Sequence, residues 1–216
     1  MNDVKMPLIC IGGGGHCKSV INVAESLGYN IKGVLDLPEK IGQKILSYTV
    51  IGCDDDMDRY INDCQFIITV GHIKSPEIRL KIWNRLSAIN AKVATIVASS
   101  ACVSNYAKIG RGTVVLNHAV VNAGAEIGIN CIINTFANIE HDVHIGDFCH
   151  ISTGAMINGD CCIGNNTFIG SQSVVVNGIT VPEKSVVAAA SLMRKTYSIP
   201  GVYSGNPAKL LIPNTK

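Results

Sequence analysis

A six-residue repeat in the second half of the chain constrains the fold more than any other feature. Every sixth residue from Val103 to Ile199 is apolar, without interruption. This period fits neither a helix nor a long strand, but it is typical of a β-solenoid whose short faces meet at tight corners. Three such faces make a coil of 18 residues, so the repeat from Val103 to Leu192 predicts five coils.

The residues around the repeated position support this interpretation. The apolar residue should fill the interior, and a small residue such as Ala101 or Cys131 usually lies two positions before it. We expect this small residue where the coil narrows. Gly or Asn often follows the apolar residue, as at Gly110 and Gly146. We expect these residues to adopt the unusual backbone angles that a corner requires.

The first half of the chain has a different pattern, in which strand-like and helix-like segments alternate. We predict strands at 7–12, 31–36 and 65–71 and helices at 16–27, 54–63 and 75–90. The last helix begins with Ser75 as N-cap and Pro76 at its first position. Its expected core face is Ile78, Leu80, Ile82, Trp83 and Leu86. The sequence therefore predicts a small parallel, Rossmann-like α/β domain over 1–97 and an all-β solenoid over 98–216.

Composition excludes several classes of protein. The net charge is +2 and no run of Lys and Arg occurs, so we expect no nucleic-acid partner. No apolar segment is long enough for a membrane span, and the start does not resemble a signal peptide, which favours a cytoplasmic protein. The nine cysteines include no CxxC pair. We interpret them as structural thiols, including Cys131 and Cys149, which should stack on adjacent coils.

A glycine-rich loop, CIGGGGHCKS, follows the first strand and opens the first helix. Backbone N–H groups in such a loop can bind an anion at the helix N-terminus. The match to a dinucleotide fingerprint is partial, because Cys17 replaces the third glycine, and a tight turn without a ligand is an equal alternative. Lys18 could reach a phosphate, and Asp36 ends the second strand, where related folds bind ribose or base.

Three histidines, His141, His144 and His150, lie close together in the repeat. A zinc site would need three converging ligands, and the spacing should place His144 on a different face from His141, so we expect no metal. A general base needs only one neutral imidazole beside a carboxylate. The stretch IEHD supplies this arrangement, because Glu140 and Asp142 flank His141.

Together these features resemble one family, the hexapeptide-repeat sugar acetyltransferases. The resemblance rests on the glycine loop, the solenoid, the motif N-T-x-x-x-I-E-H and the terminal segment SGNPAK. It implies a left-handed parallel β-helix, acetyl-CoA as co-substrate and a homotrimer with active sites between subunits. Members acetylate UDP-4-amino sugars, GDP-perosamine or sialic acid, in polysaccharide biosynthesis.

The resemblance also assigns roles to individual residues. His141 matches the catalytic base, and Asp142 matches the acid that orients it, which is usually Glu. Matches to substrate-binding positions are Gly14, His16, Lys18, Asp36, Gly71 and Asn134. Matches to positions that bind acetyl-CoA are His150, Gly159, Ala189, Pro207 and Lys209. Whether Asp142 or Glu140 orients His141 stays open, because the aspartate side chain is shorter than the family's glutamate.

These observations favour an N-acetyltransferase that acts on the 4-amino group of a nucleotide-linked sugar. The glycine loop with Lys18 and Asp36 favours a nucleotide over the alternative acceptor, sialic acid. A zinc enzyme of the gamma carbonic anhydrase type and a non-catalytic solenoid are further alternatives. The sequence does not identify the sugar or the nucleotide base.

Overall fold

The computed structural model describes residues 6–213, which form two compact units. The first unit contains the described residues up to Gly71 together with Glu77–Ile96. The second contains Val97 onward together with the short segment His72–Pro76. This segment therefore leaves the first unit between two of its elements and belongs with the solenoid.

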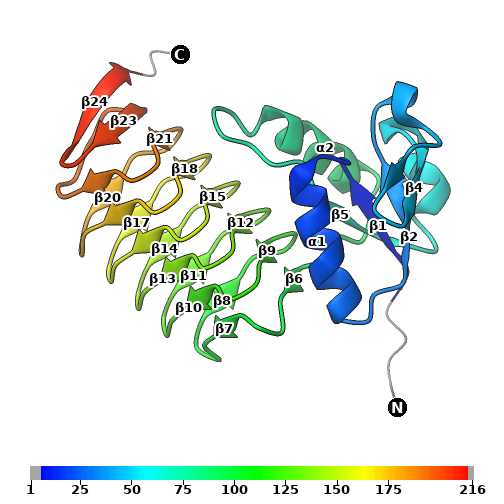
Figure 1. Cartoon of the computed structure of the whole chain (residues 1–216), viewed down its shortest axis with the longest axis horizontal. Coiled ribbons are helices and arrows are strands. Elements are labelled where there is room, and N and C mark those ends of the chain that lie inside the picture. The colour runs from blue at the N-terminus through cyan, green and yellow to red at the C-terminus, as the bar shows by residue number, and fades with distance from the viewer. Residues whose placement is uncertain (1–5, 214–216) are drawn as a thin grey trace. The chain divides into compact units, whose positions relative to one another are not determined.

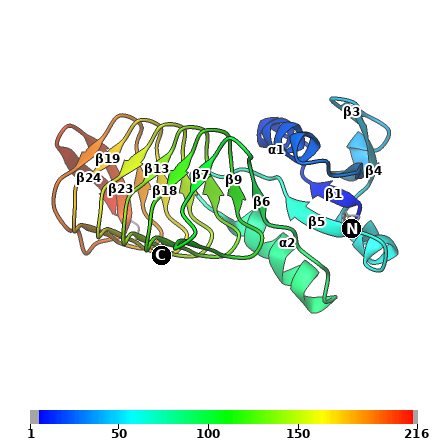
Figure 2. The same cartoon turned by 90° about the horizontal axis from the view of Figure 1, so that it is seen from below.

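The first unit is an α/β sandwich around a five-stranded sheet (Figure 1). Its elements are β1 (Leu8–Ile11), α1 (Gly15–Ser26), β2 (Ile31–Leu35), η1 (Pro38–Lys40), β3 (Lys44–Ile45), β4 (Tyr48–Gly52), η2 (Asp54–Tyr60), β5 (Gln65–Ile68) and α2 (Glu77–Ala88). The strand order is β3-β4-β2-β1-β5, and only β3 is antiparallel to its neighbour. The predicted parallel core is confirmed, whereas the hairpin of β3 and β4 was not predicted. The two α-helices cover opposite faces of the sheet (Figure 2).

The core face of α2 differs from the prediction at its first turn. Ile78 is exposed, whereas Arg79 is completely buried. The Arg79 guanidinium donates hydrogen bonds from Nη1 to the carbonyl oxygens of Ile68, at 3.1 Å, and Val70, at 2.6 Å. A buried guanidinium is tolerated when its donors are paired, so Arg79 satisfies carbonyl groups at the end of β5. Of the other predicted core residues, Ile82, Trp83 and Leu86 are buried and Leu80 is partly buried.

The second unit is a left-handed parallel β-helix with three sheets, and residues pair with partners 18 positions away (Figure 1). The first sheet contains β7 (Cys102–Val103), β10 (Val120–Val121), β13 (Asn138–Ile139), β16 (Met156–Ile157), β19 (Val174–Val175) and β22 (Leu192–Met193). The second contains β8 (Lys108–Ile109), β11 (Glu126–Ile127), β14 (His144–Ile145), β17 (Cys162–Ile163) and β20 (Thr180–Val181). The third contains β6 (Ile96–Val97), β9 (Val114–Val115), β12 (Ile132–Ile133), β15 (His150–Ile151), β18 (Phe168–Ile169), β21 (Val186–Val187), β23 (Gly201–Gly205) and β24 (Ala208–Pro213).

The repeated apolar residues fill the interior of this helix, as predicted. They are buried from Val115 to Met193, and Val103 and Ile109 of the first coil are partly buried against them. Ile199 does not belong to this set, because its side chain is 53% exposed and the solenoid strands end at Met193. The chain then turns back as the antiparallel hairpin of β23 and β24, which pairs with β21.

The role predicted for the glycines after the apolar residues is wrong. From Gly112 to Ala190, the left-handed backbone angles fall two positions later in each six-residue repeat, for example at Gly124, Phe136 and Asp142. Gly110 and Gly146 instead lie against the next coil. A Cβ atom at Gly110 would come within 2.4 Å of the backbone of Gly128, and one at Gly146 within 2.8 Å of Asn165 N. Glycine is needed there for close approach of coils.

The interior cysteines are free thiols that occupy the predicted small-residue position. Cys131, Cys149 and Cys161 each donate from Sγ to a backbone carbonyl oxygen 15 residues further along the chain, at 3.0–3.1 Å. Thr113 and Ser173 make the same bond through their hydroxyl groups. The position therefore selects small donors that satisfy a carbonyl group of the next coil. Burial, together with the neighbouring thiol of Cys131, raises the pKa of Cys149 well above its ordinary value.

Alkylation of the native protein with iodoacetamide should distinguish these thiols from the exposed ones. Cys102 and Cys162 are exposed and should be modified quickly, because the thiolate is the reactive form and needs access. Cys131, Cys149 and Cys161 should react only after denaturation. Peptide mass spectrometry over time would measure both sets, and rapid native labelling of Cys149 would contradict the fold described here.

Within residues 6–213, no helix combines the length and apolar character needed to cross a lipid bilayer.

Candidate active site

His141 and Asp142 lie together at an open corner of the solenoid, between β13 and β14. Asp142 occupies the left-handed corner position, with φ of 59°, a conformation in which aspartate is enriched. Its Oδ2 atom lies 3.0 Å from Nδ1 of His141. The two side chains are 61% and 67% exposed, so the pair faces solvent. Because a carboxylate only accepts, Nδ1 carries the proton and Nε2 of the neutral ring is left as an acceptor.

Glu140 is held apart from the imidazole by two asparagine side chains. Asn122 Nδ2 donates to Oε2 of Glu140, and Asn138 Nδ2 donates to Oε1, both at 2.9 Å. Both oxygen atoms of this carboxylate are therefore engaged. Of the two acids that flank His141 in the sequence, Asp142 is the one in hydrogen-bonding contact with the ring.

Gly159 lies directly against the His141 ring, one coil further along the same corner. A Cβ atom at Gly159 would be 2.6 Å from both Cε1 and Nε2 of His141, so no larger residue fits without moving the ring. The backbone N–H of Asp160 donates to the carbonyl oxygen of His141, which holds the two corners together. Within residues 6–213, the N–H of Gly159 itself has no acceptor. The free acceptor edge of the ring is thus adjacent to a free backbone donor.

His150 is buried on β15, half a coil away from His141. Its Nδ1–H donates to the carbonyl oxygen of His72 at 2.8 Å, and Nε2 lies 3.2 Å from Asn134 Nδ2. A carbonyl only accepts, so this contact fixes the tautomer and leaves Nε2 to accept from Asn134. Phe168 packs edge-on against the ring, with centroids 5.1 Å apart. The contact with His72, which is 78 residues away along the chain, was not predicted from the sequence.

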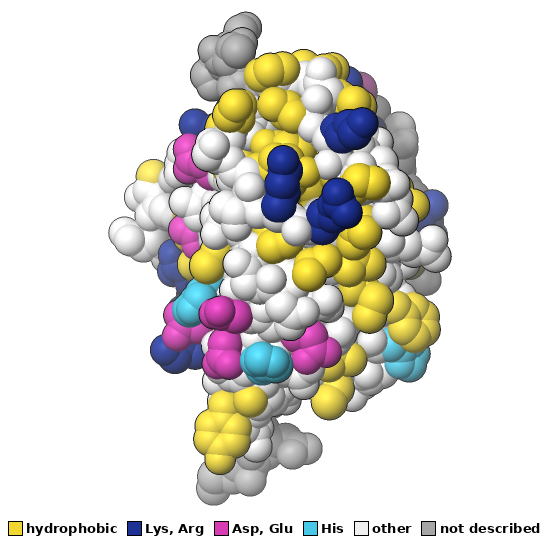
Figure 3. Space-filling view, turned by 90° about the vertical axis from the view of Figure 1, so that its left-hand side faces the viewer, with side chains coloured by type: hydrophobic (Ala, Val, Ile, Leu, Met, Phe, Trp, Pro, Cys, Tyr) yellow, Lys and Arg dark blue, Asp and Glu magenta, His cyan; other side chains and the backbone are white. Residues whose placement is uncertain are grey.

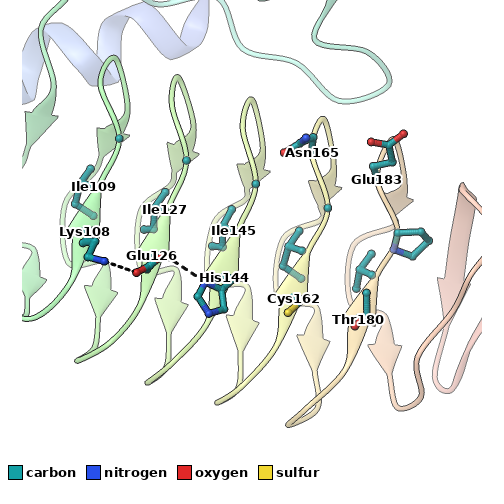
Figure 4. Close-up of a pocket in the computed structure, with 17 residues that line it drawn as sticks. Lys108, Ile109, Glu126, Ile127, His144, Ile145, Cys162, Asn165, Thr180 and Glu183 are labelled. Carbon is teal, nitrogen blue, oxygen red and sulfur yellow. Dashed lines mark hydrogen bonds and ion pairs between the residues drawn. The ribbon is translucent and has the colours of Figure 1, made fainter.

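The three histidines that suggested a metal site do not converge. His141 follows a strand of the first sheet, His144 lies on the second sheet and His150 on the third. The ring of His144 instead pairs with Glu126 at 3.6 Å, and Glu126 also binds Lys108 at 2.5 Å (Figure 4). Within residues 6–213, no three His, Cys, Asp or Glu side chains are grouped to hold a metal ion.

The glycine loop lies at the carboxyl ends of β1 and β2 in the first unit. Gly14 is the N-cap of α1, and a Cβ atom at Gly14 or Gly15 would meet no atom within 4 Å, so the loop is open. Lys18 is exposed on the first turn of α1, and His16 lies beside Gly71, where a Cβ atom would come within 3.5 Å of the histidine Cβ. Backbone N–H groups at such an open helix N-terminus can bind an anion.

Asp36 has a structural role in this loop. Its Oδ2 accepts from Gly13 N at 2.9 Å and Lys40 Nζ at 3.0 Å, and its Oδ1 accepts from Leu37 N at 2.8 Å. Burial opposes ionisation of Asp36, but the hydrogen bonds from Leu37, Lys40 and Gly13 outweigh it and lower the pKa. The ionised carboxylate therefore fixes the glycine loop to the end of β2.

Of the five residues matched to acetyl-CoA binding, Ala189, Pro207 and Lys209 lie towards the C-terminal end of the solenoid, whereas His150 and Gly159 lie in its middle coils. Pro207 and Lys209 line a pocket of 360 Å³. The other lining residues are Arg194, Lys195, Tyr197, Ala208 and Leu210. Figure 3 shows Lys and Arg side chains over an apolar surface at this end of the solenoid. Ala189 is exposed near the end of the last complete coil. Arg194 and Lys195 were not predicted as site residues, although they directly follow the solenoid strand that ends at Met193.

The chain matches two families of known proteins. Residues 7–86 match the PglD N-terminal domain, and residues 142–177 match the bacterial transferase hexapeptide repeats. No curated protein gives a significant match.

Solved structures resemble the chain over nearly its whole length. The acetyltransferase domain of PglB from Neisseria gonorrhoeae is 29% identical, with a TM-score of 0.88 over 96% of this chain and 100% of that one, and it has also been solved with acetyl coenzyme A. PerB from Caulobacter crescentus, solved with CoA and GDP-perosamine, is 25% identical, with a TM-score of 0.87 over 95% of this chain and 97% of that one. WeeI from Acinetobacter baumannii is 18% identical, with a TM-score of 0.80 over 96% of this chain and 100% of that one, and shares the fold.

Proposed function

Because the chain is a hexapeptide-repeat acyltransferase with an N-terminal domain of the PglD type, we propose that it transfers the acetyl group of acetyl-CoA to the 4-amino group of a nucleotide-linked sugar. The observation that carries this proposal is the exposed pair of His141 and Asp142 against Gly159. The pair combines a base, an orienting carboxylate and an adjacent backbone donor.

The reaction uses direct attack of the amine on the thioester. The neutral amino nitrogen of the sugar bonds to the acetyl carbonyl carbon, and Nε2 of His141 accepts the proton that the nitrogen loses. Asp142 stabilises the resulting imidazolium through Nδ1–H. The N–H of Gly159 donates to the oxyanion of the tetrahedral intermediate. The intermediate collapses when the carbon–sulfur bond breaks, and the CoA thiolate leaves with the proton returned from His141.

The separation of His141 and His150 supports a shared site in a homotrimer. The two residues are nine positions apart in a coil of 18, so they lie on different sides of the solenoid. One acetyl group therefore cannot touch both within one protomer. A neighbouring protomer would bring its His150, with Asn134, towards His141 and complete the site.

Two other regions of the chain support this choice of acceptor and donor. The open glycine loop, Lys18 and Gly71 offer donors to a sugar-linked diphosphate, and PerB is similar over nearly the whole chain in a structure that contains GDP-perosamine. The C-terminal pocket with Arg194, Lys195 and Lys209 carries the positive charge that the phosphates of CoA require.

The test is release of free thiol from acetyl-CoA in the presence of different acceptors. GDP-, UDP- and dTDP-linked 4-amino sugars and free sialic acid would be compared at equal concentration. We expect thiol release with at least one nucleotide-linked amino sugar and none above background with sialic acid. Activity with sialic acid alone would indicate an O-acetyltransferase, and no activity with any acceptor would reject the proposal.

Substitution of the two acids beside His141 tests which of them orients the ring. Asp142→Asn should lower kcat by about 100-fold or more, because an amide can stabilise the wrong tautomer and does not stabilise the imidazolium. Glu140→Gln keeps the shape of a side chain bonded to Asn122 and Asn138 and should keep most of the activity. Steady-state kinetics of both variants would measure the difference. A larger loss in Glu140→Gln would assign the orienting role to Glu140.

A further inference from the structure

A pocket of the first unit lies at the carboxyl ends of its parallel strands, beside the glycine loop. It has a volume of 270 Å³. It is lined by Ile11, Gly12, Asp36, Leu37, Pro38, Cys53, Asp54, Asp55, Val70, Ile78, Lys81, Ile82 and Arg85. These residues follow or end β1, β2, β4 and β5 or lie on α2. Ligands of open α/β sheets bind in the crevice at this edge of the sheet.

Two charged side chains in this pocket make no hydrogen bond or ion pair in the described part of the chain. Within residues 6–213, neither the carboxylate of Asp54 nor the ammonium of Lys81 makes a hydrogen bond or an ion pair. The other charges of the pocket are satisfied: Asp36 by Gly13 and Lys40, and Asp55 by Arg85 Nη1 at 2.8 Å. Asp54 and Lys81 therefore remain available for a ligand.

The Asp54 carboxylate is partly withdrawn from water although it is unpaired. Burial raises the pKa of Asp54, and the positive charges of Arg85 and Lys81 act in the opposite direction. A desolvated carboxylate without a partner is costly, and a ligand with N–H donors would relieve that cost. Lys81 interacts with Asp54 electrostatically but is not in ion-pair contact with it, which leaves space between the two groups.

Apolar side chains complete the pocket. Leu37 and Ile78 are 53% and 64% exposed, and both line the cavity with Ile82 and Val70. The helical pattern predicted that Ile78 would be buried, but its side chain is exposed at this pocket. A flat ring bound between these side chains would cover their apolar surface. The lining combines apolar walls with one acceptor and one donor, as small-molecule sites do.

Resting on the function proposed above, which holds the nucleotide in this unit, we propose that Asp54 and Lys81 select guanine as the nucleobase in this pocket. Guanine offers two adjacent donors, N1–H and the 2-amino group, which a carboxylate accepts together, and a neighbouring acceptor, O6, which suits an ammonium group. Uracil and thymine offer one N–H between two carbonyl oxygens, which a carboxylate would repel. Adenine offers one donor beside an acceptor nitrogen.

The position of the pocket agrees with the rest of the nucleotide site. Gly12 and Asp36 line the pocket and also belong to the glycine loop or bind it. A base in the pocket would therefore place its ribose near Asp36 and its diphosphate at the N-terminus of α1. The sugar would then extend from the same loop that contains His16.

The test is calorimetric titration of the full-length protein with GDP, IDP, UDP, dTDP and ADP. GDP should bind about tenfold to 100-fold more tightly than UDP or dTDP, because a bidentate base contact discriminates by that amount. IDP, which lacks the 2-amino group, should bind about tenfold more weakly than GDP. Equal affinity for GDP and IDP would overturn the role of Asp54 without any substitution of the protein.

Two variants extend the test. Asp54→Asn should lose the preference for GDP over UDP, whereas Asp63→Asn, an exposed carboxylate that does not line the pocket, should keep it. Tighter binding of UDP, with acetyl transfer to a UDP-linked amino sugar, would overturn the base assignment and leave the proposed function intact. If no nucleoside diphosphate binds, both the base assignment and the proposed function are rejected.

Discussion

Replacement of His141 with alanine is expected to lower kcat for acetyl transfer by about 100-fold to 10,000-fold, the range that general-base catalysis supplies. The side chain lies at an exposed corner beside Gly159 and Asp142, so its removal should leave the fold intact. Steady-state thiol release would measure the loss, and circular dichroism with a thermal melt would measure the fold.

His144→Ala is the matched control for this variant. His144 is also an exposed imidazole beside a carboxylate, with 58% of its side chain accessible and Glu126 at 3.6 Å, but it lies on a different sheet. We predict near-normal kcat for His144→Ala. Equal losses in the two variants would show that removing any imidazole of this surface reduces activity, and the assignment of His141 would have no support.

Gly159→Ala is expected to be the second most damaging single change. The added methyl group would lie 2.6 Å from Cε1 and Nε2 of His141, so the ring must move away from the acetyl group. A displacement on the order of 1 Å costs roughly 100-fold in rate. We expect a reduced kcat at an unchanged melting temperature, because φ at Gly159 is not in the left-handed region.

Gly154→Ala is the control that separates an effect on stability from the effect on kcat expected for Gly159→Ala. It adds a methyl group at a left-handed corner, with φ of 65°, where the nearest atom would be Gln172 Cγ at 3.6 Å. This variant should lower stability by about 1 kcal/mol and keep its kcat. Normal activity in Gly159→Ala would mean that the His141 ring does not hold its position against Gly159 during the reaction.

The repeat made much of the fold predictable from the sequence. A period of six with apolar residues in register fixes which side chains face inward. The burial of the repeated residues from Val115 to Met193 confirms this prediction. Local backbone detail was less accessible. The glycines of the repeat looked like corner residues, but they are required by the next coil, a contact 18 positions away. The corner positions themselves accept Asp, Asn, Phe, Gln or Lys, and therefore carry no clear signal.

The candidate site was also only partly predictable from the sequence. Neighbours in sequence, such as His141 and Asp142, were identified because the motif places them together. The surroundings of His150 were not, because they depend on a backbone carbonyl from the segment His72–Pro76. The burial of Arg79 in place of Ile78 also escaped prediction, since the carbonyl groups at the end of β5 select a donor against the helical pattern.

The most direct test of the central claim is the structure of the product. The protein would be incubated with acetyl-CoA and a nucleotide-linked 4-amino sugar, and the product would be examined by mass spectrometry and proton NMR. We predict a single new amide at the sugar's C4 nitrogen, formed by the wild-type protein and by His144→Ala but not by His141→Ala. An acetyl ester on a sugar hydroxyl would contradict the proposed N-acetyl transfer. The same amide formed at the wild-type rate by His141→Ala would contradict the role of His141 as the base.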